Sequence, residues 1–196
     1  MCIVGELGSG KTLTLTYLAW KNHFRKGRQV FSNYGLNGIP HTRIRSLADL
    51  EKMRDGFFAG DELWLWLDSR TSSKQMNKVT SDILLKSRKR GLTYCFTAQN
   101  MKQVDTRVRK VIDFTVYPVM TANERIVKAL VFHGSSPDTG NFMRALRFRP
   151  KPVYKLYDSR EEVKPLRQKN DIPFREIWND ERDLSKESNQ NNYDII

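Results

Sequence analysis

A glycine-rich octapeptide near the amino end constrains the fold of this chain more than any other feature. Residues Gly5-Glu6-Leu7-Gly8-Ser9-Gly10-Lys11-Thr12 match the pattern G-x-x-x-x-G-K-[ST] at every fixed position, and they follow the apolar run Cys2-Ile3-Val4. In nucleoside triphosphatases this loop joins a buried strand to a helix, so that its backbone N–H groups cradle phosphates. The sequence therefore predicts an α/β fold built around a nucleotide-binding loop.

Each part of the octapeptide has a physical role in holding ATP and Mg²⁺. The glycines let successive N–H groups turn toward the β-phosphate, where a Cβ would clash. Lys11 brings a positive charge to the β- and γ-phosphates, and the Thr12 hydroxyl is a hard oxygen ligand for Mg²⁺. A helix predicted over about residues 12–24 points its positive dipole end at the anion. The alternative is a glycine-rich turn that binds no ligand, and it gives no reason for Lys and Thr at this spacing.

The following residues alternate between predicted strands and helices. We expect strands over 28–32, 56–60, 92–98 and 114–119, and helices after Ser46, over 74–89 and over 104–111. Beyond Pro118 the pattern changes to an extension with strands over 125–133 and 146–148 and a final strand over 153–157. We divide the chain into an ATPase domain, residues 1–160, and a tail, residues 161–196, which is expected to be partly disordered or docked on the core.

Composition bounds the class of protein. The chain has 196 residues, 39% hydrophobic and 29% charged, which suits one globular domain, and no apolar run approaches the roughly 18 residues of a membrane span. Its two cysteines, Cys2 and Cys95, lie in apolar runs, so we expect buried, reduced thiols.

The charge is large and unevenly distributed. The formal net charge is +12, and residues 161–196 hold six basic and nine acidic groups, so the excess falls within residues 1–160. Such an excess indicates a polyanionic partner as well as a nucleotide. Composition does not separate DNA from RNA or an acidic protein, and a generally basic surface is the alternative.

The adjacent acids Asp61 and Glu62 are the candidates for the second half of the site. One is expected to hold Mg²⁺ through water, while the next activates the attacking water. The alternative is a solvated surface pair. Asp68 is the competing acid, but it follows the run 64–67, whose tryptophans and leucines are typical of a core.

Gln99 and a group of arginines complete the candidate residues. Gln99 ends the predicted strand 92–98, where its amide would face the γ-phosphate, although it could equally be an ordinary strand-terminal residue. An arginine could reach the γ-phosphate of a neighbouring subunit, and others could bind a phosphate backbone. The candidates are Arg70, Arg88, Arg90, Arg107 and Arg109, and each taken singly could be surface charge.

The order of these motifs resembles the FtsK/HerA superfamily of DNA-translocating ATPases. It is most similar to the small genome-packaging ATPases of archaeal viruses and the Zot-like proteins of filamentous phages. The matching segments cover roughly residues 1–160, and they are the loop, Val30–Tyr34, Asp61–Leu63 with Trp66–Arg70, Ser87–Gly91, Thr97–Gln99 and Val104–Arg109. This chain departs from the pattern in two places, its short first strand and the weakly apolar run before Asp61. Because the first strand is short, a native start upstream of Met1 stays an open alternative.

The resemblance implies a RecA-like P-loop fold, with a mostly parallel sheet flanked by helices and followed by an antiparallel extension. It implies that Lys11 and Thr12 bind nucleotide and Mg²⁺, that Asp61 assists the metal, and that Glu62 is the general base. Gln99 becomes a sensor on the strand between the acids and the loop strand, and the active sites lie between subunits of a ring. The resemblance does not assign the trans-acting arginine, for which Arg88 and Arg90 are our candidates.

The function that follows is an ATP-driven motor that packages double-stranded viral DNA into a preformed capsid. We expect a homo-oligomeric ring, a hexamer by resemblance, that contacts capsid or portal-vertex proteins in the host cytoplasm and associates with the virion. No membrane segment follows the domain, as one does in many Zot proteins, which favours packaging over membrane-bound extrusion. The alternatives are a morphogenesis or secretion ATPase acting on a protein partner, a nucleotide-gated binding module with vestigial hydrolysis, and a small-molecule kinase.

Overall fold

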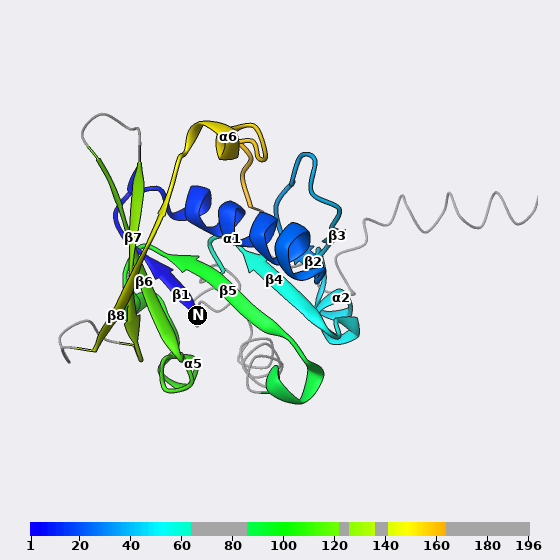
Figure 1. Ribbon diagram of the computed structural model, residues 1–196. Helices are drawn as coiled ribbons and strands as arrows, with labels where there is room; N and C mark the ends of the chain where they lie inside the picture. Colours follow the sequence, from blue (N-terminus) through cyan, green and yellow to red (C-terminus); the bar gives the residue numbers. More distant parts are fainter. Residues whose placement is uncertain (64–85, 122–125, 136–140, 164–196) are drawn as a thin grey trace, which may run out of the picture.

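A single mixed sheet organises the chain (Figure 1). The computed structural model describes residues 1–63, 86–121, 126–135 and 141–163. Within them eight strands follow the order β3-β2-β4-β5-β1-β6-β7-β8. The first six in this order pair in parallel, and β7 and β8 add an antiparallel extension. The predicted fold class is therefore confirmed.

The elements have the following bounds. The strands are β1 Cys2–Val4, β2 Gln29–Ser32, β3 Thr42–Arg43, β4 Gly56–Gly60, β5 Thr93–Ala98, β6 Phe114–Met120, β7 Val127–His133 and β8 Phe142–Phe148. The helices are α1 Lys11–Lys26, α2 Leu47–Lys52, α5 Thr106–Arg109 and α6 Lys151–Tyr154, with 3₁₀ turns η1 Arg88–Arg90 and η2 Met101–Gln103.

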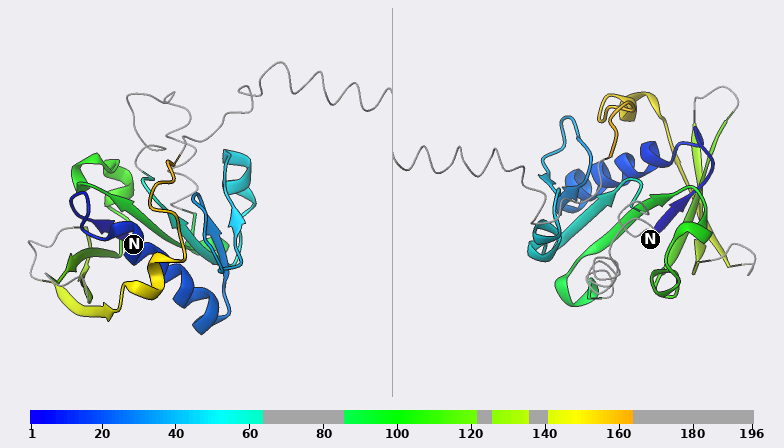
Figure 2. Two further views of the ribbon diagram at one scale, coloured as in Figure 1. Left: turned by 90° about the horizontal axis from the view of Figure 1, so that it is seen from above. Right: turned by 180° about the vertical axis from the view of Figure 1, so that it is seen from behind.

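Two hydrophobic layers cover the two faces of the parallel sheet. Alternate residues of each central strand enter different clusters: Ile3, Phe57 and Cys95 pack with α1, whereas Cys2, Phe58 and Phe96 pack with α2 and α5. Figure 2 shows α1 and α6 on one side of the sheet and α5 on the other. Burial on both faces explains why these strands read as apolar runs.

Strand β4 forms despite its weak signal in the sequence. All five of its residues are buried. A Cβ on Gly56 would lie 2.7 Å from the Gln29 carbonyl oxygen, and one on Gly60 would lie 2.8 Å from the Phe58 ring. Gly56 and Gly60 make β4 look weakly hydrophobic in the sequence, but the close packing around them leaves no room for a side chain.

The predicted final strand over 153–157 is wrong. The chain instead forms the short helix α6, in which Val153 N and Tyr154 N donate to the Pro150 carbonyl. Pro150 and Pro152 start this turn, because proline fixes a helical φ and its missing N–H costs nothing in the first turn. Val153 is buried against Leu13 and Phe148.

Other boundaries differ by a few residues. Strand β8 starts at Phe142 rather than 146, the helix expected over 104–111 is shortened to α5, and β3 had no sequence signal. The helix expected over 74–89 lies mostly outside the described residues, and its described end is a turn followed by η1. The tail beyond residue 163 lies outside them as well.

The cysteine prediction is confirmed. Cys2 and Cys95 are free and buried, and burial raises the pKa of each thiol to about 12. None of the described helices is long and apolar enough to cross a bilayer.

Candidate nucleotide-binding site

The loop between β1 and α1 has the backbone geometry of an anion site. Gly8 and Gly10 adopt φ of 76° and 90°, which side chains with a Cβ rarely tolerate. Gly10 is the N-cap of α1, so no side chain caps the helix, and no acid lies in its first turn. The first N–H groups of α1 are thus left for a ligand, and the dipole favours a negative one.

The loop is tightly folded on itself. A Cβ on Gly5 would lie 2.6 Å from Ser9 Oγ, so glycine is required there. The Ser9 hydroxyl is buried without a hydrogen-bond partner, as expected of a group that a phosphate would satisfy. Lys11 Nζ donates to the Glu6 carbonyl at 2.8 Å and so spans the loop. Burial lowers the pKa of Lys11, while Asp61 and Glu62 oppose that shift.

Asp61 follows β4 and meets the first turn of α1. Thr12 Oγ1 donates to Asp61 Oδ2 at 2.9 Å, and Thr97 Oγ1 donates to Asp61 Oδ1 at 2.7 Å. The Asp61 carboxyl is buried, which raises its pKa, while the hydrogen bonds from Thr97 and Thr12 lower it. Two hard oxygen groups therefore lie side by side where Mg²⁺ was predicted.

These oxygens suit Mg²⁺ that is shared with a nucleotide better than they suit a metal ion held by protein side chains alone. The described residues contain no group of three or more His, Cys, Asp or Glu side chains that could hold an ion. Mg²⁺ keeps several waters and binds through one or two protein oxygens together with substrate phosphates. Thr12 and Asp61 suffice for that kind of site.

Two residues hold the acidic pair in place, and the sequence did not predict this role for either of them. Asn33, which follows β2, donates from Nδ2 to the Asp61 carbonyl and accepts the Asp61 N–H at Oδ1, both at 2.7 Å. Thr97 holds the carboxylate and also accepts the Glu62 N–H at 2.7 Å. Both residues belong to the motifs that carry the resemblance. Both lie at the carboxyl ends of β2 and β5, the two strands that flank β4, and that position is the signal that could have found their role.

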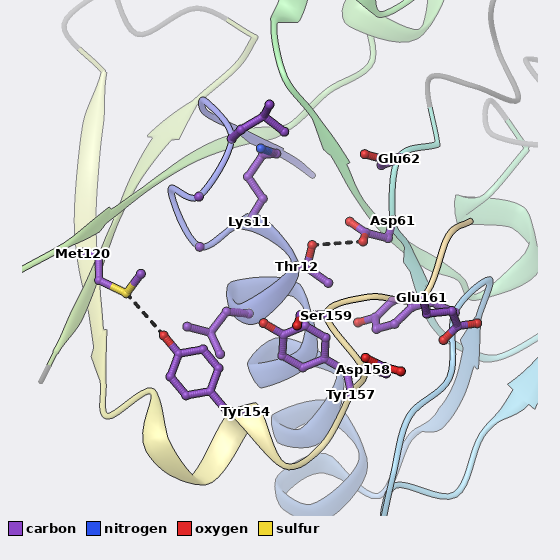
Figure 3. A pocket seen from close by; sticks show the side chains of 15 residues that line it. Lys11, Thr12, Asp61, Glu62, Met120, Tyr154, Tyr157, Asp158, Ser159 and Glu161 are labelled. Atoms are coloured by element: carbon purple, nitrogen blue, oxygen red, sulfur yellow. Dashed lines mark hydrogen bonds between the residues drawn. The ribbon is translucent and has the colours of Figure 1, made fainter. Parts of the chain in front are cut away.

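Glu62 adopts a φ of 47°, unusual for a residue with a side chain. Figure 3 shows its carboxylate beyond that of Asp61, farther from Thr12. Its pKa is raised by partial burial and by the Asp61 charge, while Lys11 opposes the shift. The adjacent acids therefore take different positions, while their predicted roles at the metal and at the γ-phosphate stay predictions.

One cavity joins these groups. Its volume is about 390 Å³, within the range of small-molecule sites, and Lys11, Thr12, Asp61 and Glu62 all line it. A second cavity of about 410 Å³ extends past Asp61 and Glu62 to residues 159–163. That cavity brings in Arg160, which the sequence reasoning did not select.

The remaining predicted residues lie farther away. Gln99 directly follows β5, between β4 and β1 as expected, but it lines neither cavity. Arg88 donates to Asp113, and Arg90 donates to the carbonyls of Leu50 and Glu51. Both arginines precede β5, at the opposite edge of the sheet from the loop, so they do not join this chain's own cavity. Asp68 and Arg70 lie outside the described residues.

A parallel sheet with a phosphate-binding loop after β1 and an acid after β4 defines the fold of the P-loop nucleoside triphosphatases. The chain belongs to the Zot family, since the family model described as zonular occludens toxin (Zot) matches residues 42–163. This match does not include the loop at residues 5–12, whose assignment rests on its motif and geometry.

One solved structure supports the fold, and a second is similar at a lower TM-score. The N-terminal domain of zonular occludens toxin from Neisseria meningitidis is 20% identical, with a TM-score of 0.55, over 80% of this chain and 97% of that one. The genome packaging NTPase B204 from Sulfolobus turreted icosahedral virus 2, in complex with ATP-gammaS, is 12% identical, with a TM-score of 0.49, over 76% and 95%. Comparison with curated protein sequences gives no match.

Proposed function

We propose that this chain hydrolyses ATP in the presence of Mg²⁺. The observation that carries the proposal is the convergence of the loop, Asp61 and Glu62 on one cavity, with a hydrogen bond from Thr12 to Asp61. These groups come from two segments separated by about fifty residues, and each has the chemistry that phosphoryl transfer to water requires.

The chain's own residues would act as follows. The N–H groups of residues 8–12 receive the phosphates, and Lys11 turns from the Glu6 carbonyl to the β- and γ-oxygens. Thr12 and Asp61 would hold Mg²⁺, which neutralises phosphate charge when bound. Glu62 accepts the proton of the attacking water, while Asn33 and Thr97 keep the acidic pair in place. Gln99 is proposed as the sensor, and Arg88 or Arg90 as a group supplied by a neighbouring subunit.

Duplex DNA is the proposed cargo, on electrostatic grounds. Lys128 of β7 and Arg147 of β8 are exposed and lie directly opposite each other. Like charges at this position destabilise a sheet, and none of the ion pairs found among the described residues involves either one. A polyanion would relieve this repulsion, in agreement with the net charge of +12.

The full proposal is a homo-oligomeric ring that moves duplex viral DNA into a preformed capsid and contacts capsid or portal-vertex proteins in the host cytoplasm. Membership of the Zot family favours one alternative, a morphogenesis or secretion ATPase that acts on a protein partner. The two differ in whether DNA stimulates hydrolysis.

Steady-state phosphate release at low salt, with and without duplex DNA, tests the proposal. Hydrolysis should be stimulated by DNA and should be lost in Lys11→Ala and Glu62→Gln, while Lys26→Ala, a charge removal at the far end of α1, serves as the control. Turnover indifferent to DNA would select the alternative partner. Tight ATP binding without turnover would select a nucleotide-gated module, and undiminished turnover in Glu62→Gln would remove Glu62 from the role of base.

A further inference from the structure

The nucleotide cavity has two chemically different ends. Lys11, Thr12, Asp61 and Glu62 form its charged end, and Met120 and Tyr154 form the apolar end. Tyr157 lies between them beside Asp158 and Ser159, and Leu7 lines the same cavity. In Figure 3, Met120 and Tyr154 lie on one side of Lys11, whereas Asp61 and Glu62 lie on the other. A bound molecule that spans the cavity therefore has one highly charged end and one apolar end.

The direction of a bound nucleotide follows from the charged end. The γ-phosphate must lie next to Glu62, because a general base acts only within hydrogen-bond reach of the attacking water. The chain of phosphates then runs along the loop, away from Asp61. The nucleoside leaves the loop on the side of Met120 and Tyr154.

The apolar end is built and held in place. Val153 anchors α6 by burial against Leu13 and Phe148, which leaves Tyr154 at the cavity, 42% exposed. Tyr154 Oη donates to Met120 Sδ at 3.6 Å and so ties α6 to the end of β6. Leu7, on the loop itself, is 80% exposed. Exposed apolar groups that converge on a cavity beside a charged site are typical of ligand recognition.

The wall that carries Tyr157 is also fixed to the core. Asn37 N donates to the Leu156 carbonyl at 2.7 Å. Glu161 accepts the Gly35 N–H at 2.7 Å and forms an ion pair with Arg43 of β3. Residues 156–161 are thus held against the turn after β2, and this wall of the cavity is formed before a ligand arrives.

We infer that Tyr154, with Met120 and Tyr157, is the platform on which the base of the nucleotide stacks, and that it accepts adenine and guanine alike. The inference rests on the proposed function, since it places the base from the position of the phosphates. Stacking on an aromatic ring tolerates any base, because every base has a π-face.

The polar groups of this platform do not separate the two purines. The platform itself offers the hydroxyls of Tyr154 and Tyr157 as side-chain partners for a base edge. The carboxylates of Asp158 and Glu161 also line the cavity, but they lie on the side of Tyr157 away from Tyr154 (Figure 3). They accept the N–H groups of Arg160 and Gly35, respectively. A hydroxyl both donates and accepts, so it satisfies the amino group of adenine as well as the carbonyl of guanine. Discrimination would need a group with only one of these capacities.

Calorimetric titration of the full chain with three magnesium-loaded probes tests the inference: ATP, GTP and tripolyphosphate. The wild-type protein should bind ATP about five- to hundredfold more tightly than tripolyphosphate, the range expected for one stacked base. ATP and GTP should agree within about tenfold. Tyr154→Ala should remove most of the advantage of ATP yet leave tripolyphosphate affinity unchanged, which also shows that the variant is folded. Tyr154→Phe keeps the ring and should retain the advantage.

The outcomes separate the two proposals. If tripolyphosphate does not bind and Lys11→Ala leaves the affinity for ATP unchanged, the proposed function fails, and the base platform fails with it. If tripolyphosphate binds but Tyr154→Ala weakens ATP no more than it weakens tripolyphosphate, only the platform is overturned. A difference beyond about tenfold between ATP and GTP overturns the claim that the platform accepts both purines.

Discussion

Replacement of Thr97 by valine should damage the acidic pair without touching either acid. Thr97 is fully buried, and its Oγ1 both donates to Asp61 Oδ1 and accepts the Glu62 N–H, each at 2.7 Å. Valine has nearly the same shape but can make neither bond. The change therefore removes hydrogen bonds and creates almost no cavity.

The expected loss of stability combines two effects. A hydrogen bond to a charged group contributes roughly 1.5–3 kcal/mol, and the partly buried Glu62 N–H left without a partner costs roughly 1–3 kcal/mol. Thr97→Val should therefore lower the free energy of unfolding by about 2.5–6 kcal/mol, a large part of the ~5–15 kcal/mol of a typical domain. Urea denaturation followed by circular dichroism measures this, and hydrolysis should fall as well because Glu62 loses its anchor.

Two variants make the measurement decisive. Thr97→Ser keeps the hydroxyl and should cost only about 1 kcal/mol for the lost methyl group. Asp61→Asn removes the charge, so adding Thr97→Val to it should cost less than adding it to the wild-type chain. If Thr97→Val is no more destabilising than Thr97→Ser, the hydrogen bonds of Thr97 do not hold the pair, and the reasoning is refuted.

Three further predictions concern other parts of the chain. The pKa of the Cys2 and Cys95 thiols is 9.0 in the unfolded chain and about 12 in the folded one. The free energy of unfolding should therefore stay constant below pH 9 and fall as the pH rises above it. A thiol reagent at about pH 8 should modify both cysteines only after denaturation. Lys128→Ala and Arg147→Ala should each weaken duplex DNA binding. Each should also reduce the slope of the logarithm of the affinity against the logarithm of the salt concentration by about one. An unchanged slope would show that the replaced residue does not contact DNA. Gly60→Ala should lower the urea midpoint by an amount equivalent to about 1–3 kcal/mol, because its Cβ would lie 2.8 Å from the Phe58 ring; an unchanged midpoint would show that the ring moves freely.

Local features could be predicted because their causes are local. The loop, the strand before it and the helix after it follow from residues within about twenty positions of one another. Gly27 ends α1 with φ of 63°, and Ser46 and Asp49 form the capping box of α2, both as short sequence patterns indicate. The wrong prediction of a strand over 153–157 also has a local cause. The prolines at 150 and 152 favour a helical turn more strongly than the alternating apolar residues favour a strand.

The candidate site could be predicted only in part. The acidic pair is visible as Asp61 and Glu62, but the residues that hold it come from two other strands, and nothing in their spacing reveals that contact. Arg88 and Arg90 look like site residues next to a strand, yet the direction of β5 puts them at the edge away from the loop. A sequence does not show at which end of a strand a ligand will lie.

The amino-acid order alone determined that a phosphate-binding loop exists here, because glycine, lysine and threonine act there through backbone conformation and charge over a few neighbouring residues. The order of strands decided the rest. Parallel pairing of β2, β4, β5 and β1 brings their carboxyl ends to one edge, and so places Asn33, Asp61 and Thr97 beside Thr12. The return of the chain through α6 adds Tyr154 to the same cavity, a contact across more than a hundred residues that only packing of the whole sheet could create.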